Sequence, residues 1–254
     1  MFSLFTAPYA FIVIRSFFIN SIVLSLLSKY KISNKSFAAR SITLFLLMIL
    51  LSNSLFAHDV VKELENMSKA DTAALYLKLG YKHILPLGFD HILFVLSLFL
   101  LSSKLKPVLW QSLAFTVAHS VTLGLAMYSV VKVSPAIVEP LIALSIMYVA
   151  LENVFIKRLR PSRIGVVFLF GLVHGLGFAS ALNSLGLPQK SFLSSLIMFN
   201  VGVEMGQLTV ILIAFFLVGK WFGNKLYYHK YIVTPLSLLI TTVALFWVIQ
   251  RTLF

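Results

Sequence analysis

The chain lacks cysteine and has few charged residues: 11% of its 254 residues are charged, and only 8 are acidic. Without cysteine there are no disulfides or thiolate ligands, so any metal site must use imidazole, carboxylate, amide or carbonyl groups. The scarcity of charge excludes an ordinary soluble domain, because 59% of the residues are hydrophobic and the mean hydropathy is +0.96. This composition predicts an all-α, polytopic transmembrane helical bundle that has the lipid bilayer as a partner.

The charge that is present is mostly positive, with 21 Lys and Arg residues and a formal net charge of +13. In a soluble protein this excess would suggest nucleic acid as the partner. Here the basic residues lie mainly between apolar segments, and no basic face is interleaved with aromatic residues. Their positions therefore indicate membrane topology and contact with anionic lipid, and we predict no nucleic-acid partner.

The N-terminal region resembles a leader. Residues 36–57 have a basic flank, an apolar stretch of about ten residues and a small-residue end at Ala57, which is the anatomy of a secretory signal peptide. The apolar stretch upstream, Tyr9 to Leu27, is either one extra helix or a leader translated from a start codon assigned too early. We divide the chain into a leader region (1–57), a short extracytoplasmic segment (58–83) and a transmembrane domain (84–254).

The transmembrane domain contains about six apolar segments, each approaching the roughly 20 residues that a spanning helix needs. They lie near residues 84–103, 108–130, 135–156, 164–183, 191–219 and 231–250. If the mature N-terminus lies outside, the inner connections hold nine basic residues and the outer ones and the tail hold three. This asymmetry is the one that the positive-inside rule requires, so we predict an extracytoplasmic mature N-terminus.

Ligand-type side chains stand at the start of the first span, where His83, Asp90 and His91 crowd its outer entrance. An ionisable group in hydrocarbon costs roughly 2.5–3.5 kcal/mol, which favours a functional role for such residues. Asp90 and His91 are about 100° apart around the helix, so both can border one cavity. The alternative is that Asp90 is only a carboxylate at a helix N-terminus and His91 an interfacial side chain.

Two further spans each carry one histidine. In the second, Thr116, His119 and Ser120 recur at three- and four-residue spacing and form a polar stripe, which could also serve only to bond helices together. In the fourth, His174 lies beside a stripe of small residues at Gly171, Gly175 and Ala179. That stripe predicts close approach of a neighbouring backbone, but a packing motif needs no imidazole.

The fifth span places Asn200, Glu204 and Gln207 on one face, at positions i, i+4 and i+7. A carboxylate flanked by two amides suits a hard or borderline cation, while the alternative is a polar interhelical network with Glu204 protonated. In the third span, Glu152 precedes a basic loop and is expected to pair with Lys157 or Arg158.

Four helices thus supply imidazole and carboxylate groups that could converge on one metal ion. This donor set suits nickel, cobalt, zinc or iron, which the sequence does not rank. We predict metal-binding roles for His83, Asp90, His91, His119, His174 and Glu204, with Thr116, Ser120, Asn200 and Gln207 as supporting polar groups.

The chain resembles the HupE/UreJ family of bacterial membrane proteins, and its second branch in particular. The resemblance lies in five runs in matching order: GFDHILFVLSLFLL, FTVAHSVTLGLA, VEPLIALSIMYVALEN, FGLVHGLGFASAL and FNVGVEMGQL. Family members are regarded as nickel or cobalt permeases, or as accessory proteins linked to hydrogenase and urease. The resemblance implies the bacterial inner membrane and metal handling by Asp90 and His91, with His119, His174 and Glu204 as further candidates.

One position departs from the better-known branch of the family, which has a His-Pro pair where this chain has Ile84 and Leu85. His83 stands one residue earlier, turned by about 100° around a helix, and this leaves the metal open between nickel, cobalt and zinc.

Our main hypothesis is a permease for a divalent transition-metal cation, most simply nickel or cobalt, with no enzymatic activity. The alternatives are an intramembrane metal-dependent hydrolase and an accessory membrane protein that works with metalloenzyme maturation proteins. No His-Glu-x-x-His or Gly-x-Ser-x-Gly motif supports the hydrolase, and no Gly-rich phosphate-binding loop indicates ATP-driven transport.

Overall fold

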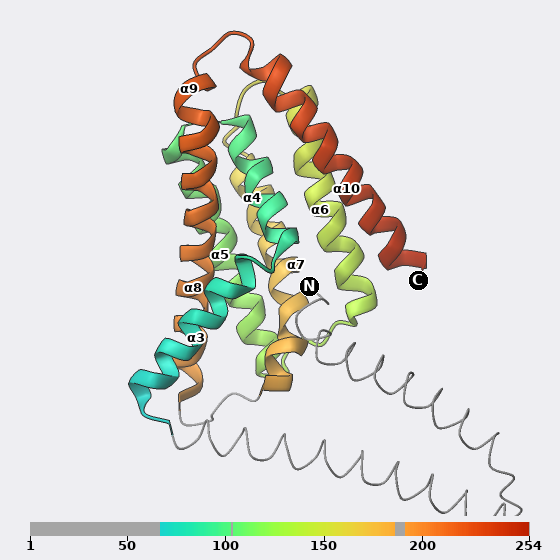
Figure 1. The fold of residues 1–254 in the computed structure, drawn as a ribbon. Coiled ribbons are helices and arrows are strands. Elements are labelled where there is room, and N and C mark those ends of the chain that lie inside the picture. The colour runs from blue at the N-terminus through green and yellow to red at the C-terminus, as the bar shows by residue number, and fades with distance from the viewer. Residues whose placement is uncertain (1–66, 103, 186–190, 254) are drawn as a thin grey trace, which may run out of the picture. The chain divides into compact units, whose positions relative to one another are not determined.

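The computed structural model describes residues 67–102, 104–185 and 191–253, without the side chains of 180–185. All regular elements in this part of the chain are helical, which confirms the all-α prediction (Figure 1). The predicted leader region, residues 1–57, lies outside the described residues. The helices are, in order, α3 (Lys69–Ile84), α4 (Phe89–Leu101), α5 (Leu105–Met127), α6 (Pro135–Phe155), α7 (Arg163–Leu185), α8 (Phe192–Ala214), η2 (Phe215–Gly219), α9 (Lys220–Phe222), η3 (His229–Val233) and α10 (Thr234–Leu253).

The number of membrane-spanning helices is lower than the six predicted. In the described residues, four helical stretches are long and apolar enough to cross a membrane: Leu105–Met127, Pro135–Phe155, Phe192–Phe222 and His229–Leu253. A fifth span results if α3 and α4, which bend by 68° between them, are counted together. The prediction was too high because α4 has only 13 residues, about 20 Å of helix. Helix α7 enters this count only over Arg163–Ala179, where its side chains are described, and over that range it is a shorter apolar helix.

The bend between α3 and α4 follows from local sequence. Pro86 disfavours helix for the residue before it, and α3 ends at Ile84. Gly88 then starts α4 as its N-cap, and a Cβ on this glycine would lie 2.1 Å from the carbonyl oxygen of His83. Only glycine allows this close turn. Figure 1 shows the bend partway along the bundle, and it brings the end of α3 and the start of α4 together inside it.

Glycines permit close contact between the helices on both sides of the bend. A Cβ on Gly80 of α3 would lie 1.9 Å from the carbonyl oxygen of Phe199 in α8, and one on Gly202 of α8 would lie 2.1 Å from that of Leu77. On α7, a Cβ on Gly171 would lie 2.5 Å from the carbonyl oxygen of Phe115 in α5. This contact between α7 and α5 confirms the close backbone approach that the small-residue stripe predicts. The contacts of Gly80 and Gly202 show that α3 is packed tightly along α8.

A buried polar network joins α4, α6 and α7. Arg163, at the start of α7, donates to the Asn153 Oδ1 atom (3.0 Å) and pairs with Glu152 (3.2 Å). Asn153 in turn donates to the carbonyl oxygen of Ser97 in α4 (2.8 Å). The prediction of an ion pair at Glu152 is confirmed, but the predicted partner was wrong: the chain turns back after α6, so that Arg163 reaches Glu152 from the next helix.

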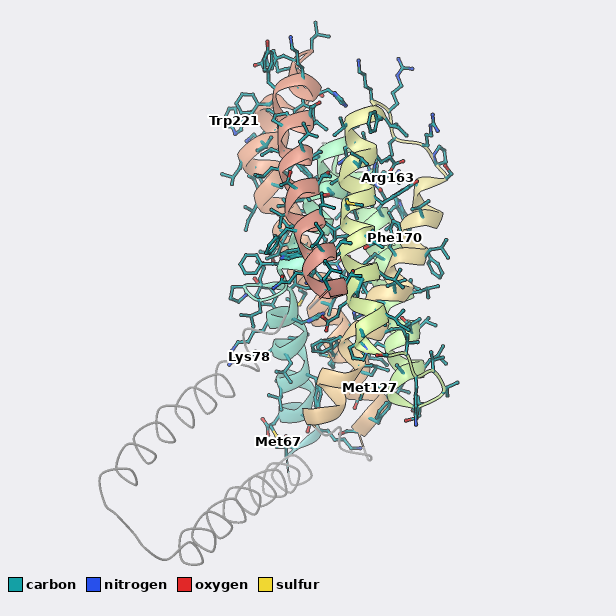
Figure 2. All side chains as sticks on the ribbon, turned by 90° about the vertical axis from the view of Figure 1, so that its right-hand side faces the viewer. Met67, Lys78, Met127, Arg163, Phe170 and Trp221 are labelled. Carbon is teal, nitrogen blue, oxygen red and sulfur yellow. The ribbon has the colours of Figure 1, made fainter. Side chains whose placement is uncertain are left out.

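The two ends of the bundle agree with the predicted alternation of loops. Figure 2 shows Arg163 and Trp221 toward one end and Met67 and Met127 toward the other. The first end carries the connections that the positive-inside pattern assigns to the inner side. The orientation in the membrane itself stays a prediction.

Candidate metal centre

Three histidines from three helices meet at the bend. His83 lies in the last turn of α3, His91 in the first turn of α4 and His119 near the middle of α5. One ring nitrogen from each can be chosen so that all three lie within 4.8 Å of one another. All three side chains are buried, although the sequence predicts His83 and His91 at the outer entrance of the first span. The difference arises because α3, which carries His83, packs closely against α8, and the bend brings the start of α4 with His91 inside the bundle.

One ring nitrogen of each residue of this histidine triad (His83, His91 and His119) has no partner in the described part of the protein. The Nε2 atom of each is buried and has no hydrogen-bond partner among the described residues. A buried polar atom without a partner costs about 1–3 kcal/mol, and three of them at one point need an explanation. A shared ligand that accepts their lone pairs supplies one, because imidazole nitrogen is the commonest protein ligand of transition metals.

Asn200 of α8 determines which nitrogen of His119 is free. The Asn200 side-chain nitrogen donates to the carbonyl oxygen of Leu196 (2.8 Å), which turns its Oδ1 atom toward the Nδ1 atom of His119 (3.3 Å). Because an amide oxygen can only accept, Nδ1 carries the proton and the lone pair lies on Nε2. The predicted supporting residue Asn200 thus holds His119 in the tautomer that leaves Nε2 free to accept a metal ion.

His174 lies beside the triad without belonging to it. Its ring centroid is 5.1 Å from that of His91, and its side chain is buried. Ser145 of α6 donates to the carbonyl oxygen of Ile142 (2.7 Å), so its hydroxyl oxygen accepts from His174 Nε2 (2.9 Å). The free lone pair of His174 is then on Nδ1, which also has no partner among the described residues.

The two predicted carboxylate ligands are engaged elsewhere. Asp90 forms an ion pair with Arg251 of α10 (3.0 Å). Glu204 of α8 accepts hydrogen bonds from Thr116 and, at 3.4 Å, from Ser112, both on α5. Neither carboxylate belongs to the triad, so the cluster as it stands offers imidazole only.

The Glu204 group lies one helical turn from the triad along the contact between α5 and α8. Gln207 accepts from Ser112 (2.6 Å), which extends the polar line by another turn. The predicted supporting residues Thr116 and Gln207 are therefore in direct contact with this line. Ser120 is not, because its hydroxyl donates to the carbonyl oxygen of Thr116 within α5 (2.6 Å).

Two residues near the cluster had no predicted site role. Ser145 is a single hydroxyl in an apolar helix, and no spacing connects it with His174. Arg251 was counted only as a charge of the chain's tail. Its place at the end of an otherwise apolar helix is the one signal that could have drawn attention to it, since a buried charge in a membrane needs a partner.

The fold and the cluster together define the class: a multi-pass helical membrane protein with a buried imidazole group able to hold a transition metal. Comparison with protein families agrees, because residues 57–251 match the model of the HupE/UreJ protein family. The chain therefore belongs to the HupE/UreJ family, in its second branch as the resemblance implies, and this family is associated with nickel and cobalt handling. Neither the curated proteins nor the solved structures gave a significant match.

Proposed function

We propose that this protein is a permease that carries a divalent transition-metal cation, nickel or cobalt, across the bacterial inner membrane. The observation that supports it most directly is the histidine triad, in which a ring nitrogen from each of three buried histidines on three helices lies within 4.8 Å of the others. Neutral imidazoles favour nickel, cobalt, zinc or copper over magnesium and calcium, which prefer oxygen ligands. Membership of the HupE/UreJ family favours nickel and cobalt within that group.

The polar line along α5 and α8 supports movement of the cation rather than permanent storage. From His119 and Asn200, the line passes to Thr116 and Glu204 and then to Gln207 with Ser112. It runs toward the end of the bundle that the positive-inside pattern assigns to the cytoplasm. A cation that leaves the triad in this direction meets oxygen ligands next, and a weaker, second site of this kind is what release requires.

Glu204→Gln is expected to lower nickel uptake by cells about tenfold or more, because the amide oxygen can still accept from Thr116 while the negative charge is removed from the route. Nickel binding to the purified variant should stay within about threefold of wild type, since Glu204 is not part of the triad. The measurements are accumulation of radioactive nickel and cobalt, and titration calorimetry in detergent.

Glu139→Gln is the matched control, because it neutralises another carboxylate, near the start of α6, and should leave uptake unchanged. Equal uptake by the Glu204→Gln variant and wild type would remove Glu204 from the route. If no variant and no wild-type cell accumulates metal while the purified protein retains one tightly bound ion, an intramembrane hydrolase or an accessory role becomes the better account.

A further inference from the structure

Arg251 forms an ion pair with Asp90, the residue that precedes His91 of the histidine triad. Its Nη2 atom donates to both oxygens of Asp90, at 3.0 and 3.1 Å. The Nη1 atom donates to the carbonyl oxygen of Glu139 in α6 (3.2 Å), and the guanidinium lies over the ring of Trp247, 5.2 Å from its centroid. The side chains of Arg251 and Asp90 are 15% and 7% exposed, so the pair is largely desolvated.

The Asp90–Arg251 ion pair lies where it can affect the binding of a cation to the histidine triad. Asp90 directly precedes His91 in the first turn of α4, so it is the acidic residue nearest in sequence to a triad member. The triad is uncharged when its imidazoles are neutral, and the Asp90–Arg251 pair has no net charge. An arriving divalent cation therefore finds Asp90, the residue that precedes His91, already paired with a cation.

We propose that Arg251 is a tethered cation that competes with the transported metal for Asp90. With the triad empty, the guanidinium neutralises Asp90. When a divalent cation binds the triad, Asp90 turns from the guanidinium to the metal, and Arg251 returns when the metal leaves. Arg251 is thus a positioning residue that limits affinity and speeds release, and this inference rests on the proposed function.

The physical basis is that removal of the guanidinium would leave Asp90 buried without a counter-charge. Such a state is strongly unfavourable, and a metal ion in the triad relieves it. Close charge pairs at buried positions couple strongly enough to change an equilibrium constant tenfold or more. The competitor therefore weakens metal binding in the wild type, and transport benefits because a tightly held ion is not released.

The test is nickel titration of the purified full-length protein in detergent. Arg251→Gln is expected to lower the Kd for nickel about tenfold or more and to slow its release, measured by chelator challenge. Arg251→Lys, which keeps the positive charge, should stay within about threefold of wild type. Asp90→Asn should weaken binding, and in the Asp90→Asn background Arg251→Gln should change Kd by less than about twofold, because nothing is left to compete for.

The sign of the effect separates this role from a structural one. If Arg251 only held α10 against α4, Arg251→Gln would lower thermal stability and leave nickel binding equal or weaker, and either binding result overturns the proposal. Trp247→Leu, which loosens the guanidinium without changing a charge, is the second variant should Arg251→Gln fail to fold. It should tighten binding about two- to fivefold, and unchanged binding overturns the proposal.

The two proposals fail in different ways. If the wild-type protein binds neither nickel nor cobalt, the proposed function is wrong and the tethered cation with it. If the wild type binds nickel and Arg251→Gln does not bind it more tightly, only the competition by Arg251 is wrong.

Discussion

His91→Ala is expected to weaken nickel binding to the purified protein at least about a hundredfold and to abolish uptake by cells. His91 is central: its ring centroid lies 4.6 Å from that of His83, 5.9 Å from that of His119 and 5.1 Å from that of His174. Loss of a partner outside the ligand shell already costs 10–100-fold in metal affinity, so loss of a ligand costs more. Titration calorimetry with nickel and cobalt measures the change.

His229→Ala is the matched control for this experiment. His229 is a histidine of the same bundle, but its Nε2 atom contacts the carbonyl oxygen of Asn153 (3.0 Å), in the separate network with Arg163. It should leave nickel affinity within about threefold of wild type. Equal loss in both variants would indicate general unfolding, which circular dichroism would show. Unchanged affinity in His91→Ala would mean that the triad does not bind the metal.

The helical fold and the polar faces were predictable because both depend on short-range periodicity. The spacing of Asn200, Glu204 and Gln207 places them on one face of a helix whatever surrounds it. In the structure this face meets the predicted stripe of α5, and Glu204 contacts Thr116. Neither helix alone determines which face of α8 packs against which face of α5. A polar stripe in a membrane, however, is stabilised by contact with another polar stripe, and few are present.

The packing of α3 could not be predicted in the same way. Its sequence carries Lys69, Asp71 and Lys78 among apolar residues, and local composition assigns it to the outside of the bilayer. The contact with α8 depends on Gly80 and Gly202, which are far apart in the sequence and show their fit only when the two backbones meet. The burial of His83 follows from this contact, so it could not be predicted from the sequence either.

The pairing of Asp90 is a second long-range feature. Arg251 follows Asp90 by 161 residues, and no periodicity connects two charges at that separation. From sequence, an acidic residue beside a histidine in an apolar segment indicates a metal ligand, because no other counter-charge is visible. The structure supplies the counter-charge from α10, and with it a reason why a carboxylate can lie next to the triad without belonging to it.

Gly175→Ala is expected to destabilise the bundle by about 1–3 kcal/mol or more, the range of overpacked cores. A Cβ at this position of α7 would lie 2.3 Å from the carbonyl oxygen of His119 and 2.2 Å from the hydroxyl oxygen of Thr122, both in α5. The backbone carbonyl cannot move aside by side-chain rotation, so α5 and α7 must separate. Because that shift moves His119, nickel affinity should fall together with the melting temperature of the purified protein in detergent.

Gly165→Ala on the same helix is the matched control, and the expected sign is opposite. A Cβ on Gly165 would have nothing within 4 Å, so the methyl group meets no neighbour. Alanine is favoured over glycine by about 0.5–1 kcal/mol in a helix interior and by less in the first turn, where Gly165 lies, so this variant should melt at the same or a slightly higher temperature. The two variants make the same Gly→Ala change on α7, once against the backbone of α5 and once against no neighbour. Equal melting temperatures for the two variants would contradict the close contact of α5 with α7, and with it the placement of His119 opposite His91.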